Sequence, residues 1–155
     1  MSKHEAWIEW RLLGGDFLRG KYSREHILKF DGGTSVAASP SPSVVPVPYS
    51  NVANVDPEEA FVASIASCHM LTFLYLASRD GFEVVGYEDA AFGVMTKNER
   101  GVPWVSSVVL SPNVEYGGTK PTFDQEQALH HRAHEECFIS QSVKTAISIE
   151  PVTRS

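Results

Sequence analysis

Cysteine is scarce in this chain of 155 residues, whose only two cysteines are Cys68 and Cys137. They lie too far apart to form a Cys-x-x-Cys motif, so their spacing gives no redox pairing. The N-terminal residues also lack the apolar stretch of a secretory signal. We therefore expect the reducing cytoplasm, where both cysteines rest as thiols and a purely structural disulfide is disfavoured.

Basic residues are also few. The chain has 13 lysines and arginines against 19 aspartates and glutamates, which gives a formal net charge of −6. No stripe of Lys and Arg offers the electrostatic footprint that binding to a phosphate backbone requires. We expect no nucleic acid among the partners.

Charge is absent altogether from one run, Ala60 to Ser78. Its length is close to the roughly 20 residues that cross a bilayer. The run nevertheless contains Ser67, His69 and Thr72, and it stands alone in an otherwise polar chain. We interpret it as a helix buried in the protein or between two subunits, and we expect no membrane partner.

A hydrophobic content of 43% is enough for a substantial core, and we expect a single domain over residues 1–155. The segment Asp56-Pro57-Glu58-Glu59 has the cap, the first-turn proline and the capping-box glutamate of a helix start. This helix should run to about Arg79 and stop at Gly81. The Ser- and Pro-rich segment Ala38 to Val55 before it predicts an ordered or semi-ordered loop.

Alternation of apolar and polar residues predicts the strands. The element order β-β-β-α-β-β-α-β indicates an α+β domain with helices on an antiparallel or mixed sheet. Strands are expected within the first forty residues, with clear alternation at Ala6–Leu12 and His26–Phe30, and then at Glu83–Met95, Val102–Val114 and Val143–Glu150; the second helix should run from Thr122 to about Cys137.

Each cysteine has a plain structural interpretation beside a chemical one. A free cysteine in an apolar helix, as predicted for Cys68, behaves as a small buried hydrophobe. Before Cys137, the residues His130 and His134 share one helical face with it and could ligate a metal; the alternative for that face is a solvated surface. His69 points away from Cys68 on the helix, and we interpret it as a hydrogen-bonded core or interface histidine.

Two segments carry a resemblance to a known family. The segment DPEEAFVASIASCHM, Asp56 to Met70, resembles the small-residue-rich, cysteine-bearing central helix of the OsmC/Ohr family of hydroperoxide reductases. The segment AHEECFISQS, Ala133 to Ser142, resembles that family's second motif, a His-Glu-x-Cys with a serine after two further residues. The two motifs together are specific, and the order of expected elements agrees with the family along most of the chain.

The resemblance implies a role for each matching residue. Cys68 matches the peroxidatic cysteine, Cys137 the resolving cysteine, and Glu58 the glutamate ten residues before the peroxidatic cysteine. The family's catalytic arginine comes from the N-terminal β region, where Arg24 matches best and Arg19 is the alternative. No cofactor and no metal are implied.

These residue types suit peroxide chemistry. Only the thiolate attacks an O–O bond, and a thiol of ordinary pKa is roughly 3% thiolate at neutral pH. A guanidinium such as that of Arg24 would lower the pKa of Cys68 and hold the peroxide oxygens. The sulfenic acid left on Cys68 would condense with Cys137 to a disulfide. An external dithiol, for which the resemblance implies a lipoylated protein, would then restore both thiols.

Helix geometry adds an inference about assembly. If Glu58 and Cys68 lie on one straight helix, ten residues separate them by about 15 Å along its axis. The carboxylate therefore cannot reach its own chain's sulfur. If Glu58 works beside Cys68, it comes from the other subunit of an intertwined two-fold homodimer.

Some residues depart from the organic-hydroperoxide branch of the family and point to an OsmC-like side branch. Phe138-Ile139 follows Cys137 where that branch more typically carries Pro-Tyr, and His69 follows Cys68. The apolar residues near both cysteines favour an organic hydroperoxide as substrate. The alternative is a non-enzymatic protein of the same fold that binds an apolar ligand at the dimer interface.

Overall fold

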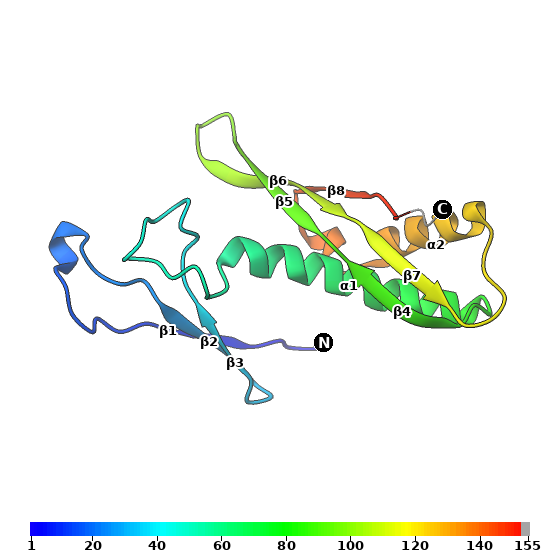
Figure 1. Cartoon of the computed structure of the whole chain (residues 1–155), viewed down its shortest axis with the longest axis horizontal. Helices are drawn as coiled ribbons and strands as arrows, with labels where there is room; N and C mark the ends of the chain where they lie inside the picture. The colour runs from blue at the N-terminus through cyan, green and yellow to red at the C-terminus, as the bar shows by residue number, and fades with distance from the viewer. Residues whose placement is uncertain (153–155) are drawn as a thin grey trace. The chain divides into compact units, whose positions relative to one another are not determined.

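The structure is a computed structural model that describes residues 1–152 (Figure 1). The chain divides into two compact units, one formed by residues 1–60 and the other beginning at residue 61. The expectation of a single domain stays a prediction.

The first unit is built on a three-stranded antiparallel sheet in the order β1-β2-β3. Trp7 lies opposite Lys29, and Leu28 lies opposite Val36. The first strand ends at Glu9 rather than at Leu12 as the alternation predicted. The elements are β1 (Ala6–Glu9), the 3-10 helix η1 (Phe17–Arg19), β2 (His26–Phe30) and β3 (Ser35–Ala38).

The Ser- and Pro-rich segment after β3 follows a defined path, as predicted. The N–H of Ser39 donates to the carbonyl of Val55 at 3.0 Å, which ties the two ends of the loop together. The side-chain amides of Asn51 and Asn54 both donate to the Glu25 carboxylate, at 2.7 and 3.2 Å. One acidic side chain thus anchors the last part of the loop to the sheet.

Helix α1 (Pro57–Arg79) has the boundaries that the sequence predicted. The backbone N–H of Glu59 donates to the Asp56 carboxylate at 2.7 Å, and the N–H of Asp56 donates to the Glu59 carboxylate at 3.0 Å, so the capping box is formed. At the other end Gly81 takes a φ of +84°, a conformation that ends helices and that side chains disfavour.

The sequence predicts two long strands after α1, and the structure has four shorter ones. Asp89 and Pro112 face each other at the break, and proline has no N–H to donate to a strand. The N–H of Ser111 donates instead to the Asp89 carboxylate at 2.7 Å. The ladder is interrupted there, which divides both predicted strands. The resulting strands are β4 (Val84–Asp89), β5 (Phe92–Lys97), β6 (Pro103–Leu110) and β7 (Pro112–Tyr116).

These strands form two sheets of the second unit. β4 pairs with β7, β5 pairs with β6, and β8 (Ala146–Ile149) adds to β6 in parallel, so of the antiparallel or mixed pairing that the sequence predicted, this sheet has the mixed form. Helix α2 (Phe123–Glu136) begins with a complete capping box between Thr122 and Gln125, and Cys137 is its C-cap. The short 3-10 helix η2 (Ser140–Ser142) links it to β8.

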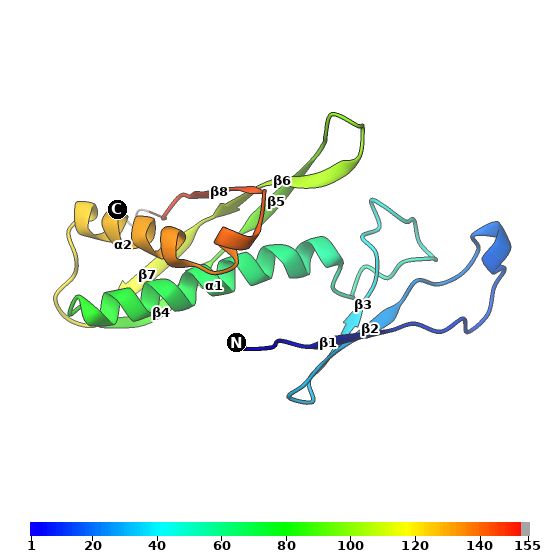
Figure 2. The same cartoon turned by 180° about the vertical axis from the view of Figure 1, so that it is seen from behind.

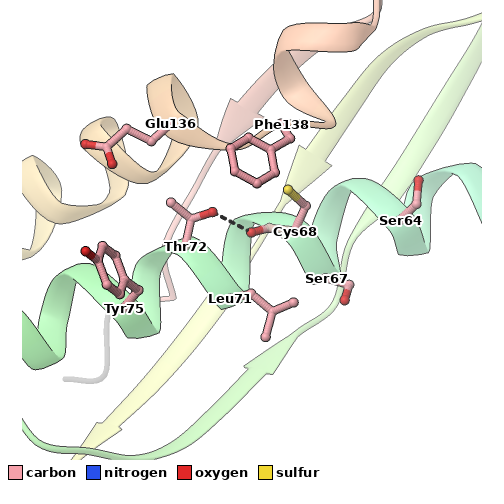
Figure 3. A pocket seen from close by; sticks show the side chains of 8 residues that line it. All are labelled: Ser64, Ser67, Cys68, Leu71, Thr72, Tyr75, Glu136 and Phe138. Carbon is pink, nitrogen blue, oxygen red and sulfur yellow. Dashed lines mark hydrogen bonds between the residues drawn. The ribbon is translucent and has the colours of Figure 1, made fainter. Parts of the chain in front are cut away.

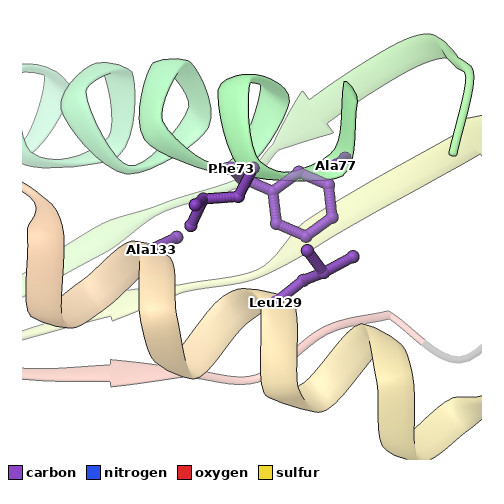
Figure 4. Packing of buried hydrophobic residues seen from close by; sticks show 5 residues of the cluster. Phe73, Ala77, Leu129 and Ala133 are labelled. Carbon is purple, nitrogen blue, oxygen red and sulfur yellow. The ribbon is translucent and has the colours of Figure 1, made fainter. Parts of the chain in front are cut away.

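Helix α1 lies between two parts of the core of this unit. Its C-terminal half runs alongside α2 in both views (Figure 1 and Figure 2). There Phe73 and Ala77 pack against Leu129 and Ala133 (Figure 4). Further towards its N-terminus, Ile65 packs against residues of β6. Helix α1, which carries Cys68, is thus held by α2 on one side and by the sheet that contains β6 on another.

Candidate functional site

The two cysteines meet where α1 and α2 pack together. Cys68 lies near the middle of α1 and is half-buried, whereas Cys137 caps the end of α2 and is fully buried. Both are free thiols, and the Cys68 thiol interacts with that of Cys137. Two residues that are distant in the sequence are therefore adjacent in the fold.

The second motif forms a tight turn that holds Cys137 inward. The backbone N–H of Ser140 donates to the Cys137 sulfur at 3.4 Å, and the N–H of Gln141 donates to the Cys137 carbonyl at 3.1 Å. The Ser142 hydroxyl donates to the Phe138 carbonyl at 2.7 Å. The serine and glutamine that follow the cysteine therefore fix the turn that presents its sulfur.

The surroundings of Cys68 within this unit disfavour its thiolate. Burial raises the pKa of the Cys68 thiol, and the interaction with Cys137 raises it further. The backbone N–H groups of Ile139 and Phe138 face the Cys68 sulfur and oppose that rise. A positive charge beside the sulfur would lower this pKa and favour the thiolate.

An open apolar groove of about 800 Å³ lies beside the Cys68 thiol. The Cys68 sulfur and the Phe138 ring lie close to each other along it, and Glu136 lies on the α2 side (Figure 3). Phe138 is 83% exposed although it is a large apolar residue. The lining residues are Ser64, Ser67, Cys68, Leu71, Thr72, Tyr75, Glu136 and Phe138.

A pair of buried histidines lies next to the cysteines. The Nε2 atom of His69 and the Nδ1 atom of His130 are 3.0 Å apart, and the two rings are nearly parallel. His69 is 0% exposed and His130 is 2% exposed. The sequence predicted a hydrogen-bonded core role for His69, which is confirmed. For His130 the expectation of a solvated face was wrong, because that face of α2 packs on α1.

Burial keeps both imidazoles neutral. Burial lowers the pKa of His69 to about 4, and the nearby His134 contributes to this shift. Burial likewise lowers the pKa of His130 to about 3, with His69 contributing. The ordinary value is 6.5, so a charge on either ring is strongly disfavoured at neutral pH.

The metal alternative finds no support in the described residues. No three His, Cys, Asp or Glu side chains within residues 1–152 are placed together to hold a metal ion. His130 uses its Nδ1 atom on His69, and Cys137 directs its sulfur to Cys68 and Ser140. The three spaced residues share a face of α2, but that face belongs to the core.

The other predicted site residues belong to the first unit. The Arg24 guanidinium donates to the carbonyls of Tyr22 and Gly20 at 2.9 and 3.3 Å and lies 4.0 Å above the Tyr22 ring. Arg19 is exposed and pairs with the Asp16 carboxylate at 3.5 Å. Glu58 lies in the first turn of α1. The structure brings the two cysteines together, and the approach of Arg24 and Glu58 to them stays a prediction.

Comparison with known proteins gives the family. The sequence profile described as OsmC-like protein matches residues 51–152. The chain belongs to the OsmC-like family. The solved structure of an OsmC-like protein of unknown function from Vibrio cholerae is 49% identical, covers 98% of this chain and 100% of its own, and has a TM-score of 0.95. The resemblance that the two motifs carry is thereby confirmed.

More distant structures share the fold. An organic hydroperoxide resistance protein from Elizabethkingia anophelis is 17% identical over 97% of this chain and 94% of its own, with a TM-score of 0.72. The organic hydroperoxide resistance protein OhrB of Bacillus subtilis is 19% identical over 97% and 98%, with a TM-score of 0.67. No curated protein matches the chain in sequence.

The fold also settles the interpretation of the apolar helix in this OsmC-like protein. By length and composition α1 could cross a membrane. Its residues Phe73 and Ala77 instead pack against α2, and Ile65 packs against β6, in a fold shared with solved OsmC-like structures. Helix α1 is therefore the core helix and not a membrane span, as the sequence predicted.

We predict that acid destabilises this OsmC-like protein through the histidine pair. The native pKa values of about 4 and 3 lie below the unfolded value of 6.5, so the unfolded state binds more protons as the pH falls. Stability should be lost from pH 6.5 downwards and level off below about 3, at up to about 1.4 kcal/mol per pH unit for each histidine. Urea unfolding at a series of pH values measures this.

The double variant His69→Leu/His130→Leu should flatten the pH dependence in that range. The matched control is His131→Leu, because the His131 side chain is 73% exposed and should leave the slope unchanged. An equally steep slope in the double variant would assign the acid sensitivity to other groups.

Proposed function

We propose that this OsmC-like protein is a cysteine-based hydroperoxide reductase. The observation that carries the proposal is the contact between two free thiols beside an apolar groove. A groove of about 800 Å³ with an apolar lining suits the organic part of a hydroperoxide better than it suits hydrogen peroxide. The names of the Elizabethkingia and Bacillus proteins, which share the fold, point to the same class of substrate.

In the proposed reaction the Cys68 thiolate attacks one oxygen of the hydroperoxide. The O–O bond breaks, the organic part leaves as an alcohol after taking up a proton, and Cys68 becomes a sulfenic acid. The Cys137 thiol then attacks the Cys68 sulfur, so that water leaves and a disulfide forms. An external dithiol, such as a lipoylated protein, reduces this disulfide by exchange and is itself oxidised to a disulfide.

Activation of Cys68 is assigned to Arg24. Within its own unit the pKa of the Cys68 thiol is raised, and a nearby cation would lower it. Arg24 donates only to neutral carbonyls, and its planar face rests on Tyr22, which leaves its charge uncompensated by a carboxylate among the described residues. Arg19 is already paired with Asp16. Glu58 of the partner subunit would orient the Arg24 guanidinium.

A homodimer is part of the proposal. Among the described residues of the first unit, Ala38 is the one hydrophobic residue that is buried. Leu13 and Leu18 are 94% and 95% exposed. A unit of about 60 residues needs more apolar burial than this to be stable. A second copy of the chain would cover this surface and would bring Glu58 of the partner subunit to the site. The proposed location is the cytoplasm.

The raised pKa of Cys68 also supports a second candidate function. A thiol that stays protonated would make the groove a binding site for an apolar ligand, without peroxide chemistry. This alternative keeps the dimer and the groove but assigns no reaction to the cysteines.

Peroxide consumption in cysteine variants decides between these functions. With cumene hydroperoxide and a dithiol reductant, Cys68→Ser should reduce consumption to the uncatalysed rate, because no sulfur remains to attack the O–O bond. Cys137→Ser should consume a first equivalent rapidly and then turn over slowly, because its sulfenic acid has no resolving thiol in the chain and must react with the external dithiol. Stopped-flow and coupled assays measure both phases.

The matched control is Ser67→Ala, which changes a groove residue beside Cys68 without removing a thiol. It should turn over many equivalents. Consumption that is unchanged in Cys68→Ser would refute the reductase and leave the binding protein.

The arginine assignment predicts a difference between two variants. Arg24→Ala should raise the pKa of Cys68 by on the order of one pH unit, because the nearby guanidinium stabilises the thiolate. Arg19→Ala, the control, should leave that pKa unchanged. The rate of iodoacetamide alkylation against pH reports the pKa, and thermal melting checks that each variant is folded. A shift found only in Arg19→Ala would transfer the role to that residue.

Assembly predicts the mass in solution. Sedimentation at micromolar concentration should give roughly double the chain mass of 17.1 kDa. The reason is the exposed apolar surface of the first unit, which is too large for a stable monomer. A monodisperse monomer would contradict the composite site.

A further inference from the structure

The packing of α1 on α2 combines an apolar layer with a buried polar contact. Phe73 of α1 packs against Leu129 and Ala133 of α2, as expected of a helix interface. In the same interface the hydrogen bond between His69 and His130 joins the two helices. His69 immediately follows Cys68 on α1, so a shift of the helix backbone at His69 also moves Cys68.

The histidine bond is isolated and directional. It is the one hydrogen bond that the described structure gives to these two rings, and the outer nitrogens, His69 Nδ1 and His130 Nε2, have no partner among the described residues. Both side chains are buried, so the pair is shielded from bulk solvent. The His130 ring also stacks on Phe73, with centroids 4.3 Å apart. Two apolar residues would pack equally well here but would not fix the distance and rotation of the helices.

We propose that the bond between His69 and His130 is a positioning contact that holds α1 and α2 where Cys68 and Cys137 close into a disulfide. This inference rests on the proposed function, because it assumes that the two thiols are oxidised together. His69 and His130 touch neither the peroxide nor the reductant, and they act through the helices that carry the cysteines.

The physical reason is effective concentration. A disulfide requires its Cβ atoms to be about 3.8 Å apart, which the backbone must allow without strain. With the histidine bond intact, little helix motion is lost when the disulfide forms. Without the bond, the reduced protein gains motion that closure must remove, so the disulfide is less favoured. By linkage, the disulfide strengthens the histidine bond by the same factor.

The test is the equilibrium between dithiol and disulfide forms in mixtures of reduced and oxidised dithiothreitol. In this exchange two protein thiols become a disulfide while one oxidised dithiothreitol becomes a dithiol. For His69→Leu/His130→Leu we expect an equilibrium constant for oxidation about tenfold smaller than that of the wild type. For this two-electron couple, that corresponds to a reduction potential less negative by about 30 mV.

Two further variants separate positioning from stability. His69→Gln can place an amide nitrogen near the position of Nε2, and it should restore most of the wild-type constant. Leu129→Ala removes buried packing from the neighbouring apolar layer, and it should lower the melting temperature while leaving the constant unchanged. A constant that follows the melting temperature across all variants would overturn the proposal and leave a structural role only.

A measurement on the wild type keeps the test independent of folding in the variants. The histidine bond should open less often in the disulfide form, so the ring proton shared by His69 and His130 should exchange with water about tenfold more slowly there than in the dithiol form. Nuclear magnetic resonance of the imidazole nitrogens measures this. Equal exchange in both forms would overturn the proposal. If no disulfide between Cys68 and Cys137 forms in the wild type, the proposed function fails together with it.

Discussion

The packing of α1 against α2 is the interaction on which the rest of this protein depends. Neither helix carries a complete site, since Cys68 belongs to one and Cys137 to the end of the other. Phe73 and Leu129 hold the helices together, and the capping boxes fix where each helix begins. The α1–α2 interface therefore sets both the stability of the second unit and the geometry of the two thiols. Burial has an opposing effect there, because the packing that brings the sulfurs together also raises the pKa of Cys68.

Features set by nearby residues could be predicted from the sequence. Helix α1 was predicted from Asp56 to Gly81 because a cap, a proline and a glycine are local signals. The break between β4 and β5 could not be predicted, because it depends on a hydrogen bond to Asp89 of β4 from Ser111, which lies between β6 and β7. The contact of the cysteines is also long-range, and only the family resemblance suggested it.

Histidine burial illustrates the same limit at the site. His130 lies on a helix that is rich in charged residues, so its sequence neighbours suggest exposure. Its actual surroundings come from α1, through His69 and Phe73. The sequence signal for the burial of His130 was its position on the helical face that carries Leu129 and Ala133. These two residues form an apolar stripe. A histidine in such a stripe is expected to have a hydrogen-bond partner on the helix that it packs against.

The unequal exposure of the two sulfurs determines how the proposed cycle would be reset. Cys137 is fully buried and turned inward by Ser140, whereas Cys68 opens on the groove. A bulky reductant can therefore attack only the Cys68 side of a disulfide, and Cys137 is the leaving group that returns to the interior. The hydroperoxide and the reductant would both reach the Cys68 sulfur through the groove, and they could not occupy it at the same time. The proposed cycle would therefore follow ping-pong kinetics, in which each partner binds only after the other has left.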